Sequence, residues 1–235
     1  MTFLHFQCLK DAPDRQVEID SILAGAGLPD ASLKTIRPFE AAVTPEILYG
    51  IDGLIIGGAG WSAFDDIPYY QEFLEVLRAA REKHVPILGI CFGAQTLAHL
   101  FGGVVVRDDA NAEYGSIEVT CEPAASQDPM FSDMPADFTA QSWHHDRIAV
   151  LPTDALPLAH SRSGAVLQAF SFPGERIWGV QFHPERTAAT FERLLGQRPA
   201  PDADHPIETI RASLKPSPDA TALLARFVRL AADSR

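Results

Sequence analysis

The spacing of hydrophobic residues along the first hundred positions alternates between two periods. Short apolar runs predict strands, and longer stretches with apolar residues every three or four positions predict helices between them. The predicted strands cover residues 3–8, 32–36, 53–56 and 86–90, and the predicted helices cover 16–26, 69–83 and 92–101. Because strands that alternate with helices form parallel sheets covered on both faces, the pattern predicts an α/β fold.

The pattern changes after residue 104, where helical spacing largely disappears. Apolar runs separated by Pro, Gly and Asp turns predict strands at 104–106, 116–121, 137–142, 166–170 and 177–182. We expect these strands to be antiparallel additions at the far side of the sheet. The whole is then an open, mixed, mostly parallel sheet flanked by helices.

The 50 residues after Glu185 predict helices. A helix at 188–195 is followed by a joint rich in Pro and Asp at 198–206, and a last helix covers 219–232 with Ser217 as its candidate N-cap. We expect residues 1–195 to form one domain and residues 196–235 to be a helical C-terminal extension packed on that same domain.

Composition and charge narrow the function classes. The 235 residues are 46% hydrophobic and 21% charged, as in soluble globular proteins, and a net charge of −12 argues against nucleic acid or an anionic membrane as partner. The apolar stretches are shorter than the ~20 residues that span a bilayer, and the N-terminus lacks the features of a signal peptide. Three cysteines without a CxxC pair predict a reduced, cytoplasmic setting.

The most informative segment surrounds Cys91. An apolar strand runs into this cysteine, a helix follows at once, and Gly89 and Gly93 stand two positions before and after it. This is the nucleophile-elbow pattern, in which the flanking glycines make room for a tight turn with a strained backbone. At a helix N-terminus the unpaired N–H groups favour negative charge on the sulfur, and the N–H of Phe92 is placed to bind a substrate oxyanion.

A nucleophilic thiol requires a base and a group that orients the base. The best candidates are His183 and Glu185, which follow the apolar strand predicted at 177–182. Residues two positions apart in an extended chain point to the same side, so the carboxylate can reach the imidazole. Functional groups in open α/β sheets gather at the carboxyl ends of strands, where Cys91 is also expected.

Two segments together resemble one family. The stretches Gly-Ile-Cys-Phe-Gly-Ala-Gln at 89–95 and Gly-Val-Gln-Phe-His-Pro-Glu at 179–185 are similar to the motifs of class I (triad) glutamine amidotransferases, in particular the amidotransferase domain of GMP synthases. The resemblance extends over about residues 1–195 and includes the glycine loop at 54–60 and the segments 113–115 and 143–146. It implies an open mixed sheet with a flavodoxin-like core.

The resemblance also implies a reaction. Cys91 attacks the side-chain carboxamide of glutamine, His183 moves the proton, and Glu185 orients the imidazole. The N–H groups of Gly58 and Phe92 form the oxyanion hole. A γ-glutamyl thioester forms and is hydrolysed to glutamate, and no cofactor or metal takes part.

The resemblance further assigns substrate contacts and partners. Gln95 helps to bind the amino-acid end of glutamine, assisted by main chain near His145 and Asp146. In the family the ammonia passes to a synthetase domain or subunit, and the residues after Glu185 are too few to hold one. A separate synthetase subunit is therefore a candidate partner.

The sequence departs from the family at two positions. His145 stands where the GMP synthase pattern has glycine, and the loop at 57–60 continues into Trp61 without the usual proline. These departures leave open a stand-alone γ-glutamyl peptidase or amide hydrolase that uses the same triad. A non-catalytic relative, or another α/β family with an elbow cysteine, fits the intact Cys91, His183 and Glu185 less well.

The remaining histidines and cysteines predict structural roles. The adjacent His144 and His145 lack further ligands at zinc-like spacing, so no metal site is expected. Cys8 and Cys121 lie in predicted strands and are expected to be small core residues. We expect the other histidines, including His205, to be structural or exposed.

Overall fold

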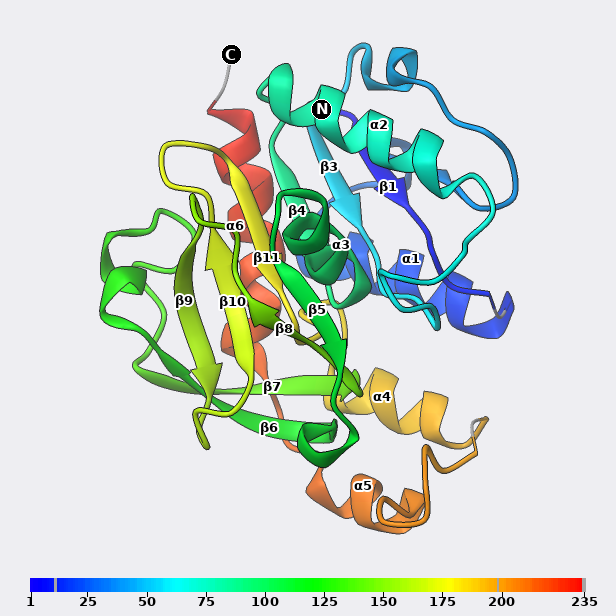
Figure 1. Cartoon of the computed structure of the whole chain (residues 1–235). Helices are drawn as coiled ribbons and strands as arrows, with labels where there is room; N and C mark the ends of the chain where they lie inside the picture. The colour runs from blue at the N-terminus through cyan, green and yellow to red at the C-terminus, as the bar shows by residue number, and fades with distance from the viewer. Residues whose placement is uncertain (11, 198, 234–235) are drawn as a thin grey trace.

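The computed structural model describes residues 1–10, 12–197 and 199–233. Its centre is a nine-stranded mixed sheet with helices on both faces, which confirms the predicted fold class (Figure 1). The strand order is β2-β1-β3-β4-β11-β10-β9-β6-β7. The strands are β1 (Phe3–Phe6), β2 (Leu33–Ile36), β3 (Gly53–Ile56), β4 (Ile87–Ile90), β6 (Glu113–Cys121), β7 (Asp137–His144), β9 (Leu156–Ser161), β10 (Leu167–Ser171) and β11 (Ile177–Val180).

The sheet divides into a parallel and an antiparallel half. Strands β2, β1, β3, β4 and β11 run parallel to one another, whereas β10, β9, β6 and β7 are added in antiparallel pairs. The N-terminal strands are only four residues long and almost wholly buried in β1, β3 and β4, as parallel strands covered on both faces require. The candidate site lies in the parallel half.

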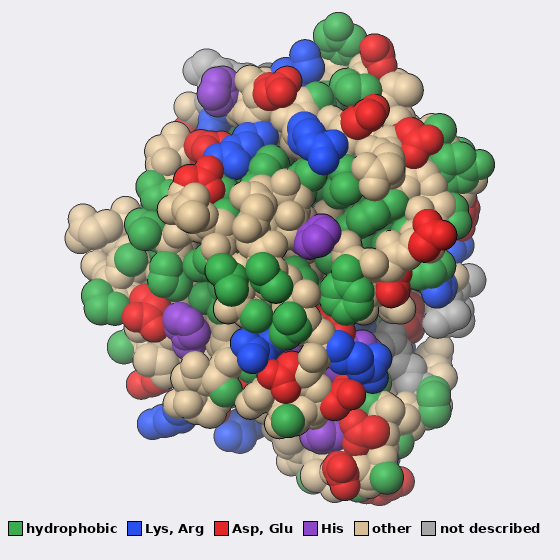
Figure 2. Space-filling view, viewed as in Figure 1, with side chains coloured by type: hydrophobic (Ala, Val, Ile, Leu, Met, Phe, Trp, Pro, Cys, Tyr) green, Lys and Arg blue, Asp and Glu red, His purple; other side chains and the backbone are tan. Residues whose placement is uncertain are grey.

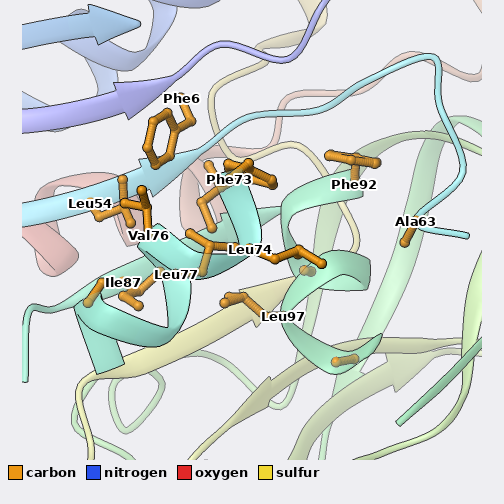
Figure 3. Packing of buried hydrophobic residues seen from close by; sticks show 14 of the residues in the cluster. Phe6, Leu54, Ala63, Phe73, Leu74, Val76, Leu77, Ile87, Phe92 and Leu97 are labelled. Carbon is orange, nitrogen blue, oxygen red and sulfur yellow. The ribbon is translucent and has the colours of Figure 1, made fainter. Parts of the chain in front are cut away.

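Helices cover the two faces of the sheet in separate layers, and two more lie at one end of the molecule (Figure 1). The helices are α1 (Ala12–Ala26), α2 (Tyr70–Glu82), α3 (Phe92–Leu100), α4 (Ala188–Leu195), α5 (Ile207–Ser213) and α6 (Pro218–Ala232), with short 3₁₀ turns at Asp30–Ser32, Pro45–Leu48, Asp109–Asn111 and Pro123–Gln127. Apolar side chains of α2 and α3, such as Phe73 and Leu97, pack on one face against Leu54 and Ile87 of the sheet (Figure 3). Helices α1 and α6 pack on the other face, where Phe227 contacts Phe3 and Trp178.

Several details of the sequence prediction are corrected. The strand predicted at 104–106 does not join the main sheet, because β5 (Val104–Arg107) pairs with β8 (Asp146–Val150) in a separate two-stranded sheet. Strands β8 and β9 and helix α5 were not predicted. Ser217 does occupy the N-cap of α6, but its hydroxyl accepts a hydrogen bond from Gln141 instead of capping the helix.

Helices α4 and α5 lie at the end of the molecule toward which the arrows of β1 and β3 point (Figure 1). At the same end of the view, basic, acidic and histidine side chains stand close together on the surface (Figure 2). The joint expected at 198–206 leads from α4 to α5, and its first residue, Arg198, is outside the described residues. None of the described helices is long and apolar enough to cross a membrane.

Candidate active site

Cys91 sits at a sharp turn between β4 and α3. Its backbone has φ 51° and ψ −106°, in the left-handed half of conformational space that a non-glycine residue adopts only under strain. A Cβ at Gly89 would lie 2.7 Å from the carbonyl group of Gly93, and a Cβ at Gly93 would strike the carbonyl oxygen of Ile56. The two glycines are therefore needed for steric reasons, as the elbow pattern predicts.

The sheet brings the distant histidine segment to the same turn. Strand β11 pairs in parallel with β4, so Val180 lies opposite Ile90. The N–H of Cys91 donates to the carbonyl of Val180 over 2.8 Å, and the chain then continues through Gln181 to His183. Because both strands end at the same edge, the cysteine and the histidine meet although they are far apart in sequence.

His183 and Glu185 form a buried, hydrogen-bonded pair. Nδ1 of His183 lies 2.7 Å from Oε1 of Glu185, and the side chains are 6% and 1% exposed. Arg186 places its Nε 3.3 Å from the same carboxylate oxygen. The carboxylate thus holds one ring nitrogen and leaves Nε2 for the sulfur side.

The charges of this pair follow from its surroundings. Burial opposes charge on the His183 ring, but the Glu185 carboxylate and a hydrogen bond with Cys91 outweigh it and raise the pKa of His183 to about 9. Burial also opposes ionisation of Glu185, yet the imidazole and the Arg186 guanidinium hold the pKa of that carboxyl below its usual range. At neutral pH the proton is therefore on His183 and Glu185 is ionised.

Gly58 closes the site from the side of β3. A Cβ at this position would lie 3.0 Å from Cε1 of His183 and 3.8 Å from Cβ of Cys91. Only a residue without a side chain leaves the imidazole in place. The loop backbone that follows β3 therefore approaches both reactive side chains closely.

A cavity of about 740 Å³ opens above these residues. Cys91, His183 and Gly58 lie in its lining, together with His145, which the sequence placed near the substrate. Its outer wall includes the segment 199–205 between α4 and α5, which sequence reasoning did not connect with the site.

Three aromatic rings join this segment to the sheet. The ring of Tyr114 lies 5.1 Å from that of Trp143 and 4.8 Å from that of His205, measured between centroids. His205, which was expected to be structural or exposed, is 34% exposed and also lies in the lining of the cavity. Asp202 accepts a hydrogen bond from the His205 ring and so fixes the turn at that position.

The other predicted substrate contacts lie behind the wall of the cavity. Gln95 is buried, and its Nε2 donates to the carbonyl of Asp146 over 2.9 Å and to Oε1 of Gln181 over 3.1 Å. Asp146 is buried as well, with its Oδ1 3.5 Å from Nε2 of His145. The proximity of Gln181 to the sulfur was not predicted, although the residue lies inside the quoted motif.

Of the residues expected to be structural, His144 and Cys8 are buried, whereas Cys121 is less buried than the core position expected for it. His144 is buried and contacts Glu113 at 3.0 Å, and among the described residues no cluster of His, Cys, Asp and Glu is suited to a metal ion. Cys8 is buried, and burial together with nearby Glu18 raises the pKa of its thiol. Cys121 is only half-buried at the end of β6, and Trp61 packs beneath the ammonium group of Lys10.

Comparison with known proteins identifies the family. Residues 30–197 match the family model of glutamine amidotransferase class-I. The GMP synthase (glutamine-hydrolyzing) of Porphyromonas gingivalis is 36% identical over 141 residues, which are 60% of this chain and 26% of that protein. The corresponding enzyme of Thermosipho africanus is 33% identical over 139 residues, which are 59% of this chain and 25% of that protein. The match thus spans about a quarter of the length of these relatives.

Solved structures agree on the fold. A glutamine amidotransferase from Thermotoga maritima superimposes with a TM-score of 0.79 at 19% identity, covering 100% of this chain and 99% of that one. A putative GMP synthase subunit from Thermoplasma acidophilum has a TM-score of 0.70 at 21% identity, covering 99% of this chain and 94% of that one. The family-model match over residues 30–197 shows that the chain belongs to the class I glutamine amidotransferase family.

Proposed function

We propose that this chain hydrolyses the side-chain amide of glutamine to glutamate and ammonia through a thioester on Cys91. The observation that carries the proposal is the continuous chain of contacts from the Cys91 sulfur through His183, both in the lining of the cavity, to the buried carboxylate of Glu185. The family membership supports the same chemistry. The surroundings of each of these three residues favour the role that the proposed reaction gives it.

The thiolate of Cys91 attacks the carboxamide carbon and forms a tetrahedral adduct. The N–H groups of Gly58 and Phe92 bind the negative oxygen, since Gly58 lies beside Cys91 and His183 and Phe92 begins α3. The imidazolium of His183 then gives its proton to the departing nitrogen, the C–N bond breaks, and ammonia leaves.

Water completes the reaction. His183, now neutral, takes a proton from a water molecule that attacks the thioester carbonyl, and the C–S bond breaks to release glutamate. Glu185 keeps the ring in the tautomer and orientation that both steps need. At the mouth of the site, His145 and the main chain around Asp146 are the candidates to hold the amino-acid end of the substrate, and Gln95 supports them from behind the wall.

The ammonia acceptor in this proposal is a synthetase on a separate chain. Its support is that the curated relatives are GMP synthases and that a solved relative is described as a putative GMP synthase subunit. A partner would be identified by pull-down with the purified chain, followed by a test for ATP-dependent transfer of amide nitrogen.

The enzymatic proposal is tested with L-glutamine and the purified protein. We expect release of ammonia and glutamate in equal amounts, and none from Cys91→Ala. A diazoketone that mimics glutamine should label Cys91, as mapped by peptide mass spectrometry. Labelling of Cys8 or Cys121 in its place would refute the assignment of the nucleophile.

The cavity supports a second candidate, hydrolysis of larger γ-glutamyl amides. Its volume of about 740 Å³ lies within the range of roughly 300–1,000 Å³ that suits drug-sized ligands, so glutamine alone leaves much of it unfilled. Turnover of γ-glutamyl dipeptides with a higher kcat/KM than glutamine, in the absence of any partner, would select this candidate. A preference for glutamine would select the amidotransferase.

A further inference from the structure

The side chain of Gln181 lies against the reactive sulfur, and the reaction described above does not use it. It is 1% exposed and follows β11 directly, with its backbone N–H bonded to the carbonyl of Gln168. Its Nε2 lies 3.6 Å from Sγ of Cys91, within hydrogen-bonding distance for sulfur. Its Oε1 lies 3.1 Å from Nε2 of Gln95.

The hydrogen-bond network determines which end of this amide faces the sulfur. The carbonyl of Asp146 can only accept, so the group of Gln95 that lies 2.9 Å from it must be the NH₂. The second hydrogen of that NH₂ points to Gln181, which must present its oxygen there. The NH₂ of Gln181 is then left for Cys91.

Each member of this chain is held in place by backbone structure. Gln95 follows Cys91 by one helical turn, and its N–H donates to the carbonyl of Cys91 over 3.0 Å. Asp146 begins β8 and is buried. Rotating the Gln181 amide would set two carbonyl oxygens or two NH₂ groups against each other in a buried site, which is costly.

The sulfur therefore meets hydrogen-bond donors on two sides. His183, whose ring carries the proton at neutral pH, is the titratable group that contacts it, and the neutral amide of Gln181 is the other donor. Donors of this kind stabilise a thiolate and do little for a thiol, because hydrogen bonds to ionised acceptors are the stronger ones.

We propose that Gln181 is a catalytic residue that stabilises the thiolate of Cys91 by hydrogen bonding, and that Gln95 is a positioning residue that orients the Gln181 amide. This inference rests on the proposed role of Cys91 as nucleophile. It gives Gln95 a function in addition to the substrate contact that the family resemblance implies.

The test measures alkylation of Cys91 by iodoacetamide, which reacts with thiolates and needs no bound substrate. Mass spectrometry of the Cys91 peptide separates this reaction from any at Cys8 or Cys121. We expect Gln181→Met to slow the reaction about tenfold at neutral pH and to move its pH profile upward, since one hydrogen bond to a charged group is lost. A rate and profile equal to those of the wild type would overturn the proposal.

Two variants separate this effect from simple loss of structure. Gln181→Glu keeps the shape and places a carboxylate against the sulfur, so it should slow alkylation more than Gln181→Met, and an unchanged rate would contradict the inference. The matched control is Gln141→Met, which removes an equally buried amide that bonds to Ser217 and the carbonyl of Lys215. We expect this control to lower thermal stability and to leave Cys91 alkylation unchanged.

A further pair of variants tests the positioning role of Gln95. Gln95→Met should slow alkylation in the same direction as Gln181→Met, and the double variant should be no slower than Gln181→Met alone, because both act through one hydrogen bond. A rise in KM for glutamine with unchanged alkylation would refute the positioning role.

The result is also independent of turnover. If the wild type does not hydrolyse glutamine and Gln181→Met still slows alkylation of Cys91, the proposed function fails and this inference stands. If the protein hydrolyses glutamine and Gln181→Met does not slow alkylation of Cys91, this inference fails and the proposed function stands.

Discussion

Oε1 of Glu185 lies 2.7 Å from Nδ1 of His183, and both side chains are almost completely buried. The contact fixes the ring and supplies the negative charge that raises the pKa of His183 to about 9 against the opposing effect of burial. In the proposed reaction the carboxylate therefore acts through the imidazole, and it contributes to orientation and to charge at the same time.

Replacing Glu185 should lower activity less than replacing the base. We expect Glu185→Gln to reduce kcat, with a loss about 10- to 100-fold smaller than that of His183→Ala, since the oriented base is weakened but not removed. Steady-state glutamine hydrolysis measures both. Glu192→Gln, which alters an exposed pair with Arg211, is the matched control and should retain wild-type kcat. Equal losses in Glu185→Gln and His183→Ala would contradict a role in which Glu185 acts only through the imidazole.

The charge on His183 predicts a pH dependence. Its pKa in the folded chain, about 9, exceeds the value of 6.5 in an unfolded chain, so the imidazolium stabilises the fold fully below pH 6.5. That stabilisation is lost as the pH rises through about 9. Urea unfolding of wild type and His183→Gln should therefore show a gap in stability that narrows across this window. A gap that stays constant across this window would show that folding does not raise the pKa of His183.

Hydrolysis should decline over the same alkaline range, because the departing nitrogen needs the proton that His183 loses. The measurement is the pH profile of kcat for glutamine above neutrality. A kcat that remains constant well above pH 9 would mean that another group protonates the ammonia.

The elbow glycines should be intolerant of any side chain. Gly89→Ala places a methyl group 2.7 Å from backbone atoms of Gly93, which can move only if β4 and α3 separate. We expect a loss of about 1–3 kcal/mol in unfolding free energy, as for other overpacked sites, and a larger loss of activity through displacement of Cys91. Gly196→Ala is the matched control, because its added methyl would lie 3.6 Å from the nearest neighbour at a negative φ. Similar thermal stability for both variants would contradict the steric argument.

The elbow and the triad segment could be predicted from the sequence because their signals are local. The glycines around Cys91 indicate a turn whose strain is contained within five residues. His183 and Glu185 are only two residues apart, but they meet across a turn after the end of β11, in which the N–H of Arg186 bonds to the carbonyl of His183, and not in the extended strand that the sequence predicted. That the two segments meet follows from a general rule about parallel strands. No long-range contact had to be predicted to place these groups at one edge.

Other features depend on contacts between distant residues that leave no local pattern. The segment 199–205 carries turn residues typical of a surface loop, and only its packing on Tyr114 makes it a wall of the cavity. The sequence of β5 predicts an ordinary strand. Its pairing with β8 depends on where β8 lies in the folded chain, which no local pattern predicts. The Gln181 amide lies inside a recognised motif, but its bond to the sulfur requires the register of β4 and β11.

A buried hydrogen bond anchors β11, the strand that precedes His183. Removing this bond should lower the stability of the fold and leave the reaction unchanged. The indole Nε1 of Trp178 in β11 donates to the carboxylate of Asp128, at 3.0 and 3.2 Å from its two oxygens, and the N–H of Met130 bonds to the same side chain. Asp128→Ala leaves both donors unpaired in the core, so we expect unfolding free energy to fall by about 2–4 kcal/mol in a urea titration. Kinetic constants per folded molecule should stay unchanged, because the site lies at the far end of β11.

The exposed Asp133, which pairs with Arg226 at 3.7 Å, supplies the matched control, and Asp133→Ala should cost less than about 1 kcal/mol. Equal costs for the two variants would show that the indole contact contributes nothing beyond a surface ion pair.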